Sequence, residues 1–83
     1  MSEIDKICSR LKQLRQRHGV SQERFAEIAG MSYKYYQHLE AGRKRRILLE
    51  TVERLGEAYG IEAWQIIGPE LPENTRLKEI SRG

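Results

Sequence analysis

Four consecutive bases, Arg43-Lys44-Arg45-Arg46, are the side chains with the clearest chemical potential in this sequence. The whole chain has a formal net charge of only +3, so this basic run is a local feature of an otherwise balanced chain. Guanidinium and ammonium groups bind phosphates, and a cluster of them favours contact with a polyanion at one place. Taken alone, such a run is also typical of a solvated turn, so the neighbouring elements must decide between the two interpretations.

The sequence contains no recognisable catalytic arrangement. Its seven glycines stand singly rather than in a phosphate-binding loop, and no serine lies in a nucleophile-elbow pattern. Cys8 and His18 would lie about 15 Å apart along one helix, which is too far for a catalytic dyad. These two residues and His38 do not have the spacing of zinc ligands. We therefore expect a binding protein rather than an enzyme, without a cofactor or a metal.

Length and composition predict one small domain followed by a polar tail. The chain has 83 residues, of which 39% are hydrophobic and 33% charged, a balance typical of a soluble folded domain. The periodic apolar pattern covers residues 1–68, and residues 69–83 form the tail. The longest apolar run has only three residues, 47–49, whereas a membrane span needs about 20. A single cysteine suits a reducing compartment, so we expect a cytoplasmic protein without membrane contact.

Apolar residues recur at helical spacing along most of the chain. Ile4, Ile7, Leu11 and Leu14 form one stripe of a first helix, which Gly19 ends. Four shorter helices are expected at about 22–29, 33–41, 48–59 and 62–67. The expected inner face of the fourth comprises Leu49, Val52, Leu55 and Tyr59. No segment alternates polar and apolar residues over five or more positions, so the expected fold class is all-α, a compact five-helix domain.

The most informative unit runs from Ser21 to Gly42 and contains two short helices. Ser21 and Ser32 are the expected N-caps, and Gly30 in the turn between them tolerates a left-handed backbone. Two short helices joined in this way form a helix-turn-helix, whose second helix enters the major groove of DNA. The side chains expected to anchor that helix are Tyr36 and Leu39. Those expected on its outer side are Tyr33, Lys34, Gln37 and His38.

A series of spaced residues runs in a fixed order from Leu14 to Ile61. Its members are Leu14-Arg15, Gly19-Val20-Ser21-Gln22-Glu23, Phe25-Ala26, Ala29-Gly30-Met31-Ser32, Leu39-Glu40, Gly42-Arg43, Leu55 and Ala58-Tyr59-Gly60-Ile61. The series resembles the XRE-type, lambda-repressor/Cro-like helix-turn-helix family over about residues 4–68. The resemblance implies a five-helix DNA-binding domain of a bacterial or phage-encoded regulator, restriction-modification controller or antitoxin.

The same resemblance implies roles for individual residues. Gln22 matches a glutamine that bonds a phosphate or braces a base-reading side chain. Arg15 and Glu40 match a structural ion pair between the first and third helices, and Trp64 matches an aromatic residue that packs on the core. The residues expected to contact DNA are Ser21, Gln22, Ser32, Tyr33, Lys34, Tyr35, Gln37, His38, Arg43, Lys44, Arg45 and Arg46. For Tyr35, Gln37 and His38 a solvated surface position is the alternative.

The sequence departs from the family pattern in two places. Three tyrosines between positions 33 and 36 are unusual, and tyrosine has no bidentate code for a base, so the target sequence is not specified. The loop after Gly42 is about one residue longer than usual, and it lacks the proline and serine that commonly open the fourth helix.

A single domain of this size has a small footprint on DNA. We expect a homodimer on a palindromic operator of double-stranded DNA, with half-sites about 34 Å apart, that regulates transcription as a repressor. The expected dimer surface comprises Trp64, Ile66, Ile67 and Leu71. The alternative is an antitoxin-type or other protein-interaction module. Its partner contact would be in the tail, at Glu70, Leu71, Glu73, Leu77, Glu79 and Ile80.

Overall fold

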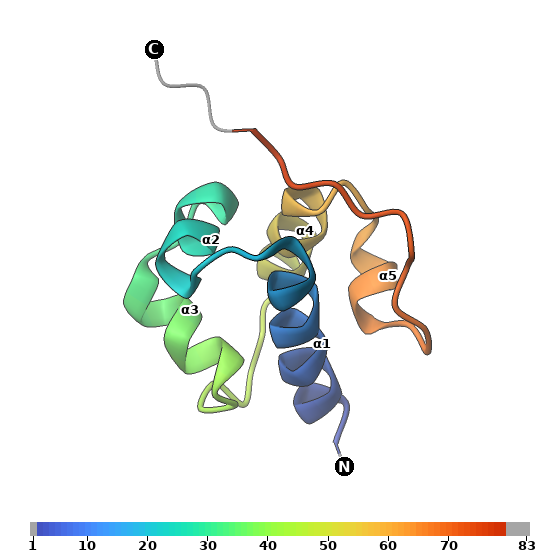
Figure 1. Ribbon diagram of the computed structural model, residues 1–83. Coiled ribbons are helices and arrows are strands. Elements are labelled where there is room, and N and C mark those ends of the chain that lie inside the picture. The colour runs from blue at the N-terminus through green and yellow to red at the C-terminus, as the bar shows by residue number, and fades with distance from the viewer. Residues whose placement is uncertain (1, 80–83) are drawn as a thin grey trace.

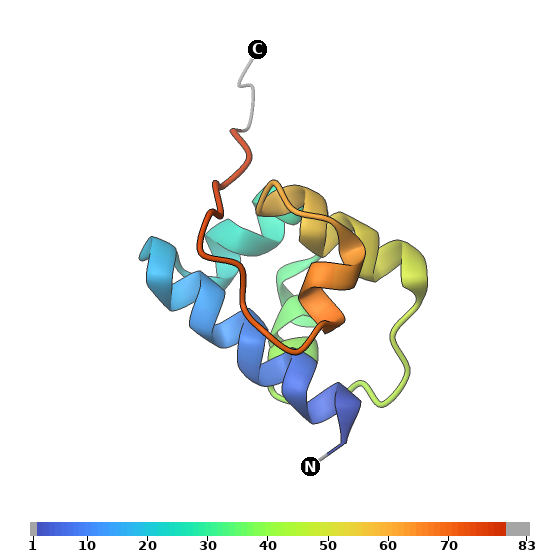
Figure 2. The ribbon, with the colours of Figure 1, turned by 90° about the vertical axis from the view of Figure 1, so that its right-hand side faces the viewer.

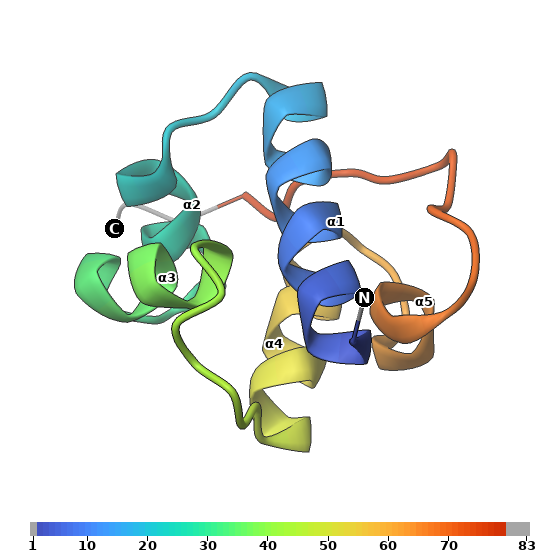
Figure 3. The same cartoon turned by 90° about the horizontal axis from the view of Figure 1, so that it is seen from below.

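The computed structural model describes residues 2–79, which form five helices and, within that range, no strand. The helices are α1 (Glu3–His18), α2 (Gln22–Ala29), α3 (Tyr33–Glu40), α4 (Leu49–Ala58) and α5 (Ala63–Ile67). In Figures 1 and 3, α1 lies in the middle, with the α2–α3 pair on one side and α5 on the other. The all-α expectation is confirmed, and the expected ends of the helices agree with the observed ones to within one residue.

Serine side chains begin the first three helices. The backbone N–H of Asp5 donates to Ser2 Oγ at 3.2 Å, and the Asp5 carboxylate accepts in return from the Ser2 backbone. Ser21 Oγ accepts from the N–H of Arg24 at 3.0 Å, and Ser32 Oγ accepts from that of Tyr35 at 3.1 Å. Each cap satisfies a backbone donor that the first turn of a helix leaves without an intrahelical partner.

The core is built around the ring of Phe25 on α2. Its centroid lies 4.9 Å from that of Tyr36 on α3 and 4.9 Å from that of Tyr59, which directly follows α4. All three rings are fully buried, and such large aromatic side chains contribute much of the apolar area that a small core buries. The other buried side chains of this cluster are Ile7, Leu11, Leu14, Ala26, Ile28, Ala29, Leu39, Val52, Leu55, Ala58 and Ile66.

Three sequence-based expectations about the core are wrong. Leu49 is 65% exposed, because the first turn of α4 projects beyond the other helices, as Figure 3 shows. On α5, the expected core residue Trp64 is 67% exposed, whereas the expected surface residue Ile66 is fully buried. Residues two positions apart on a helix point about 200° apart, so burying Ile66 turns Trp64 toward solvent.

The corner between α4 and α5 depends on a glycine. A Cβ atom at Gly56 would lie 2.8 Å from the backbone oxygen of Ile61, closer than real side chains approach. The N–H of Ile61 donates to the oxygen of Gly56 at 2.9 Å across the same contact. Only glycine lets the chain turn so closely on the side of α4, and the turn then places α5 against the core.

Residues 69–79, the C-terminal segment, fold back over the ends of α1 and α4, as Figure 2 shows. The backbone N–H groups of Arg76 and Lys78 donate to the oxygens of Tyr59 and Ala58 at 2.9 and 2.8 Å. Leu71 and Leu77 pack against the core. From α1, two side chains reach this segment: Arg17 Nη1 donates to the oxygen of Pro72 at 2.6 Å, and His18 Nε2 lies 2.8 Å from Thr75 Oγ1. These contacts attach the described part of the tail to the domain.

None of the helices in the described range is both long and apolar enough to cross a lipid bilayer.

Candidate nucleic-acid interface

The turn between α2 and α3 sets the direction of α3. Gly30 has a φ of 72°, a left-handed conformation that side chains disfavour, and Met31 N–H donates to the oxygen of Ala26 at 3.0 Å. Ser32 then caps α3 at once, so the two helices are joined by a very short connection. The inner face of α3 is fixed by Tyr36 and Leu39, which are fully buried.

The outer side of α3 carries the side chains that the sequence predicts to read bases. Tyr33, Lys34 and Gln37 are exposed, whereas His38 is half-buried. Gln37 Nε2 donates to the hydroxyl oxygen of Tyr33 at 3.2 Å, one helical turn away. Tyr35, for which the sequence left a solvated position open, is half-buried and packs partly against the core.

The loop after α3 folds back over that helix. Lys44 Nζ lies 5.5 Å from the centre of the Tyr35 ring, within the range of a cation–π contact. Lys44 and Tyr35, with Ser32, Lys34 and His38, line an open hollow of about 220 Å³. Residues from the helix and from the basic run therefore share one surface, although the sequence separates them by up to a dozen positions.

Arg45 differs from the other members of the basic run because it is bound within the molecule. Its Nη1 donates to Asp5 Oδ1 at 3.0 Å and its Nη2 to Ser2 Oγ at 3.2 Å, both at the start of α1. The hydrogen bond from Arg45, followed by those from Ser2, lowers the pKa of Asp5. Arg43 and Arg46 are exposed. Among the bases predicted to bind phosphates, Arg45 is therefore the one whose guanidinium is already bound to a carboxylate, which would compete with a phosphate.

The charges are segregated along the chain and in space. Residues 33–46 contain five basic side chains and one acidic side chain, whereas residues 47–75 contain one basic and six acidic ones. The single acid of the first group is Glu40, whose side chain is only 4% exposed. The acidic residues of the second group belong to α4 and to the segments on both sides of α5, which itself carries no charge. Figure 3 shows α3 to one side of α1. Residues 33–46 therefore present basic groups and almost no carboxylate of their own, although Asp5 of α1 pairs with Arg45.

Glu40 connects three helices at the end of α3. Arg15 on α1 donates from Nε to Glu40 Oε2 at 2.9 Å and from Nη2 to Oε1 at 2.8 Å, which forms the expected ion pair in a bidentate geometry. Gln22 at the start of α2 donates from Nε2 to Glu40 Oε1 at 3.2 Å. The resemblance gives Gln22 a phosphate contact or the support of a base-reading side chain, and in the free protein its amide contacts the ion pair. The ion pair and this contact hold α3 against α1 and α2.

The environment of Glu40 determines its ionisation. Burial is the largest single influence and raises the pKa of Glu40, but the hydrogen bonds and positive charge of its neighbours, first among them Arg15, together outweigh burial, so that the pKa of Glu40 is lowered. The carboxylate therefore remains charged at neutral pH. A buried, paired carboxylate of this kind has a structural role, which is the role that the sequence favoured over a catalytic one.

Other potentially reactive groups do not form a second site. Cys8 is buried, and burial raises the pKa of its thiol, which makes it a small core side chain. Within residues 2–79, His, Cys, Asp and Glu side chains do not gather into a group of three that could hold a metal ion.

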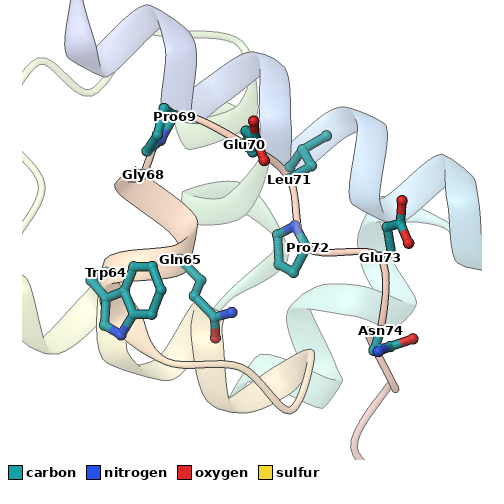
Figure 4. Close-up of a pocket in the computed structure, with 9 residues that line it drawn as sticks. All are labelled: Trp64, Gln65, Gly68, Pro69, Glu70, Leu71, Pro72, Glu73 and Asn74. Carbon is teal, nitrogen blue, oxygen red and sulfur yellow. The ribbon is translucent and has the colours of Figure 1, made fainter.

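The residues predicted for a dimer surface are partly accessible. Trp64 and Ile67 are exposed, Leu71 is half-buried, and the fully buried Ile66 has no surface to offer. Figure 4 shows the indole of Trp64 beside a hollow of about 480 Å³, between α5 and the C-terminal segment. Glu70 and Glu73 also line this hollow.

The predicted partner contact in the tail is mostly occupied by the chain itself. Leu71 and Leu77 pack against the core, so their apolar surface is partly used. Glu70, Glu73 and Glu79 are exposed. Ile80 lies outside the described residues.

Comparison with known proteins agrees with this geometry. Residues 11–63 match the helix-turn-helix family, and the match covers the second half of α1, all of α2, α3 and α4, and the first residue of α5. The chain therefore belongs to this family, as its XRE-type, lambda-repressor-like series of spaced residues indicates. It is also 37% identical over 62 residues to the HTH-type transcriptional regulator DdrOP3 of Deinococcus deserti. That alignment covers 75% of this chain and 47% of the relative, so the chain spans about half of the relative's length. No solved structure gives a significant match.

Proposed function

We propose that this protein binds double-stranded DNA in a sequence-specific manner and regulates transcription as a repressor, by occupying an operator. The observation that carries the proposal is the surface formed by the outer side of α3 and the basic run. It combines four basic side chains that have no acidic partner within the described residues, Lys34, Arg43, Lys44 and Arg46, with one buried acid, Glu40, on the helix that this family uses for recognition. The relative from Deinococcus deserti is itself named a transcriptional regulator, which supports this proposal.

The arrangement of α3 suits the major groove, which admits a single helix. In the proposed complex the outer side of α3 contacts base edges through Tyr33, Lys34, Gln37 and His38. In the loop, Lys44 lies against Tyr35 of that helix, and the exposed Arg43 and Arg46 neutralise phosphates of the flanking backbone together with it in the proposed complex. Ser21 and Ser32 lie at helix N-termini, where backbone N–H groups favour phosphate oxygens. Binding, and not catalysis, is the activity that these side chains support.

We also propose that two copies bind a palindromic operator. A two-fold axis in the DNA is matched by a two-fold axis in a protein dimer, and pairing doubles the number of bases read. Trp64 and Ile67 supply exposed apolar surface on α5, and Leu71 of the C-terminal segment lines the same hollow as Trp64 (Figure 4). Ile66 is fully buried and is therefore not included in this proposed surface.

The test is selection of bound duplexes from a random pool at about 0.1 M salt, followed by sequencing. The chain is compared with a Lys34→Ala/His38→Ala variant and with a Lys12→Ala/Gln16→Ala variant, whose changes lie on exposed positions of α1. The proposal predicts a palindromic sequence for the native chain and the α1 variant, lost in the α3 variant. Weak, salt-sensitive binding without any enriched sequence would refute sequence-specific regulation.

A further inference from the structure

The hydrogen bond between Gln37 and Tyr33 constrains how this part of α3 meets a base. The two residues are four positions apart, so their side chains are neighbours on the helix surface, next to Lys34 and His38. Gln37 Nε2 donates to the Tyr33 hydroxyl oxygen at 3.2 Å. Tyr33 is 43% exposed and Gln37 is exposed as well, so the hydrogen-bonded pair is accessible to a duplex.

The remaining hydrogen-bonding groups of Gln37 define what it can recognise. The amide nitrogen has two hydrogens, and Tyr33 takes one of them, which leaves one N–H donor and the Oε1 acceptor. In the major groove adenine presents an acceptor, N7, beside a donor, the N6 amino group. Guanine presents two adjacent acceptors, which one remaining N–H cannot satisfy. The donor–acceptor pair left on Gln37 is therefore complementary to adenine.

We propose that Gln37 reads an adenine in each half-site, and that Tyr33 is the positioning residue that holds its amide. This inference rests on the proposed function, because it specifies one contact of the same interface. A glutamine side chain without a partner on a helix surface samples many rotamers, and fixing one rotamer when DNA binds costs conformational entropy. The hydrogen bond to Tyr33 orders the amide in the free protein, so that less freedom is lost when the base is bound.

The experiment uses the duplex that the native chain selects. Each adenine of a half-site is replaced in turn by 7-deaza-adenine, which lacks the N7 acceptor, and binding is measured for the native chain and the Gln37→Ala variant. We expect one adenine whose replacement weakens native binding about fivefold or more and does not affect the variant. Replacing that adenine by another base is expected to weaken native binding roughly five- to a hundredfold. Gln16→Ala, an exposed glutamine on α1, is the matched control.

Tyr33→Phe tests the positioning role because it removes only the hydroxyl. We expect it to reduce the preference for the same adenine several-fold and to leave the other selected positions unchanged. The double variant Tyr33→Phe/Gln37→Ala is expected to bind as tightly as Gln37→Ala alone, because Tyr33 acts only through Gln37. Loss of preference at a different base pair would overturn the role of Tyr33.

Two outcomes separate this inference from the function on which it rests. If the native chain selects a sequence but Gln37→Ala keeps every base preference, or loses one for a base other than adenine, only the inference is overturned. If the native chain selects no sequence at all, the proposed function fails and the inference fails with it.

Discussion

Arg15 and Glu40 are separated by 25 positions in the chain, and they form a bidentate ion pair with both nitrogen–oxygen distances below 3 Å. The third guanidinium contact, from Nη1 to the oxygen of Val20, is 2.9 Å long and ties the same side chain to the segment between α1 and α2. Glu40 is the last residue of α3. The pair therefore fixes the end of the helix that we propose to read DNA.

Removing one partner of this pair should strongly destabilise the domain. Arg15→Met would leave the Glu40 carboxylate buried without its counter-ion, at a cost of about 3–5 kcal/mol in the free energy of unfolding. The measurement is urea unfolding followed by circular dichroism. Arg24→Met is the control, because Arg24 pairs with Glu27 on the surface, where a pair is worth about 0–1 kcal/mol. Equal losses in the two variants would contradict a buried, structural pair.

The stability of the domain should fall in acid because of Glu40. Its pKa in the folded protein lies below the ordinary value of 4.5, which represents the unfolded chain. A lowered folded pKa gives stability that is complete above about 4.5 and is lost as the pH falls through the folded pKa. The check is the free energy of unfolding from pH 7 down to pH 3. Glu40→Gln should make the free energy of unfolding depend less on pH. Asp5→Asn should remove a different contribution to the pH dependence, because the hydrogen bond from Arg45 lowers the pKa of Asp5 as well.

The bases of the run should not contribute equally to DNA binding. Each phosphate neutralised steepens the dependence of log K on log salt by about 0.9. We expect Arg46→Ala to reduce the slope by about that amount. We expect a smaller reduction for Arg45→Ala, because Asp5 already holds that guanidinium. Titrations at several salt concentrations measure both slopes. A larger change for Arg45→Ala than for Arg46→Ala would show that the contact with Asp5 does not persist on DNA.

Gly56 should not tolerate even one added methyl group. In most helices Gly→Ala is stabilising, by about 0.5–1 kcal/mol. Here the new Cβ would meet the oxygen of Ile61 at 2.8 Å, so we expect Gly56→Ala to destabilise the domain by about 1–3 kcal/mol. Thermal unfolding measures the change. Gly19→Ala is a useful comparison, because a Cβ there meets no atom within 4 Å and only the positive φ opposes it. A stabilised Gly56→Ala protein would disprove the close approach of α4 and α5.

The C-terminal segment should contribute to the stability of the helices. A chain ending at Gly68 loses the backbone hydrogen bonds to Tyr59 and Ala58 and the packing of Leu71 and Leu77. We expect its melting temperature to be lower than that of the full chain by several degrees. A chain ending at position 79 keeps every one of these contacts, and we expect it to melt like the full chain. An unchanged melting temperature for the shorter chain would show that the segment is only loosely attached.

The features that sequence analysis predicted correctly are determined by nearby residues. Ser21 and Ser32 cap the helices that they precede, and Gly19 and Gly30 end helices in the left-handed conformation. Such signals act within one helical turn, so they can be read without knowledge of the fold. The pairing of Arg15 with Glu40 spans a much longer distance, and it was accessible only because the chain resembles a family.

The features that sequence analysis missed depend on distant parts of the chain. The five-residue helix α5 is too short to define an apolar stripe, and its apolar residues Trp64, Ile66 and Ile67 gave no basis for choosing the buried one. The segment after it is mostly polar. Its attachment combines backbone hydrogen bonds, contacts from Arg17 and His18, and two apolar side chains, Leu71 and Leu77, which are too few to form a periodic pattern. The contact of Arg45 with α1 joins residues 40 positions apart. Nothing local in the sequence specifies these contacts.

Residues 33–46 carry five basic side chains and one acid, whereas residues 47–75 carry one basic and six acidic side chains. Near a duplex, the field of the phosphates attracts the first group and repels the second, so it exerts a torque on the molecule. Screening limits this effect to about 8 Å at physiological salt, so the rotation takes place in the last step before contact. Orientation is what slows most encounters between two large molecules. For the complex that we propose, this distribution of charge is expected to turn α3 toward the duplex before contact.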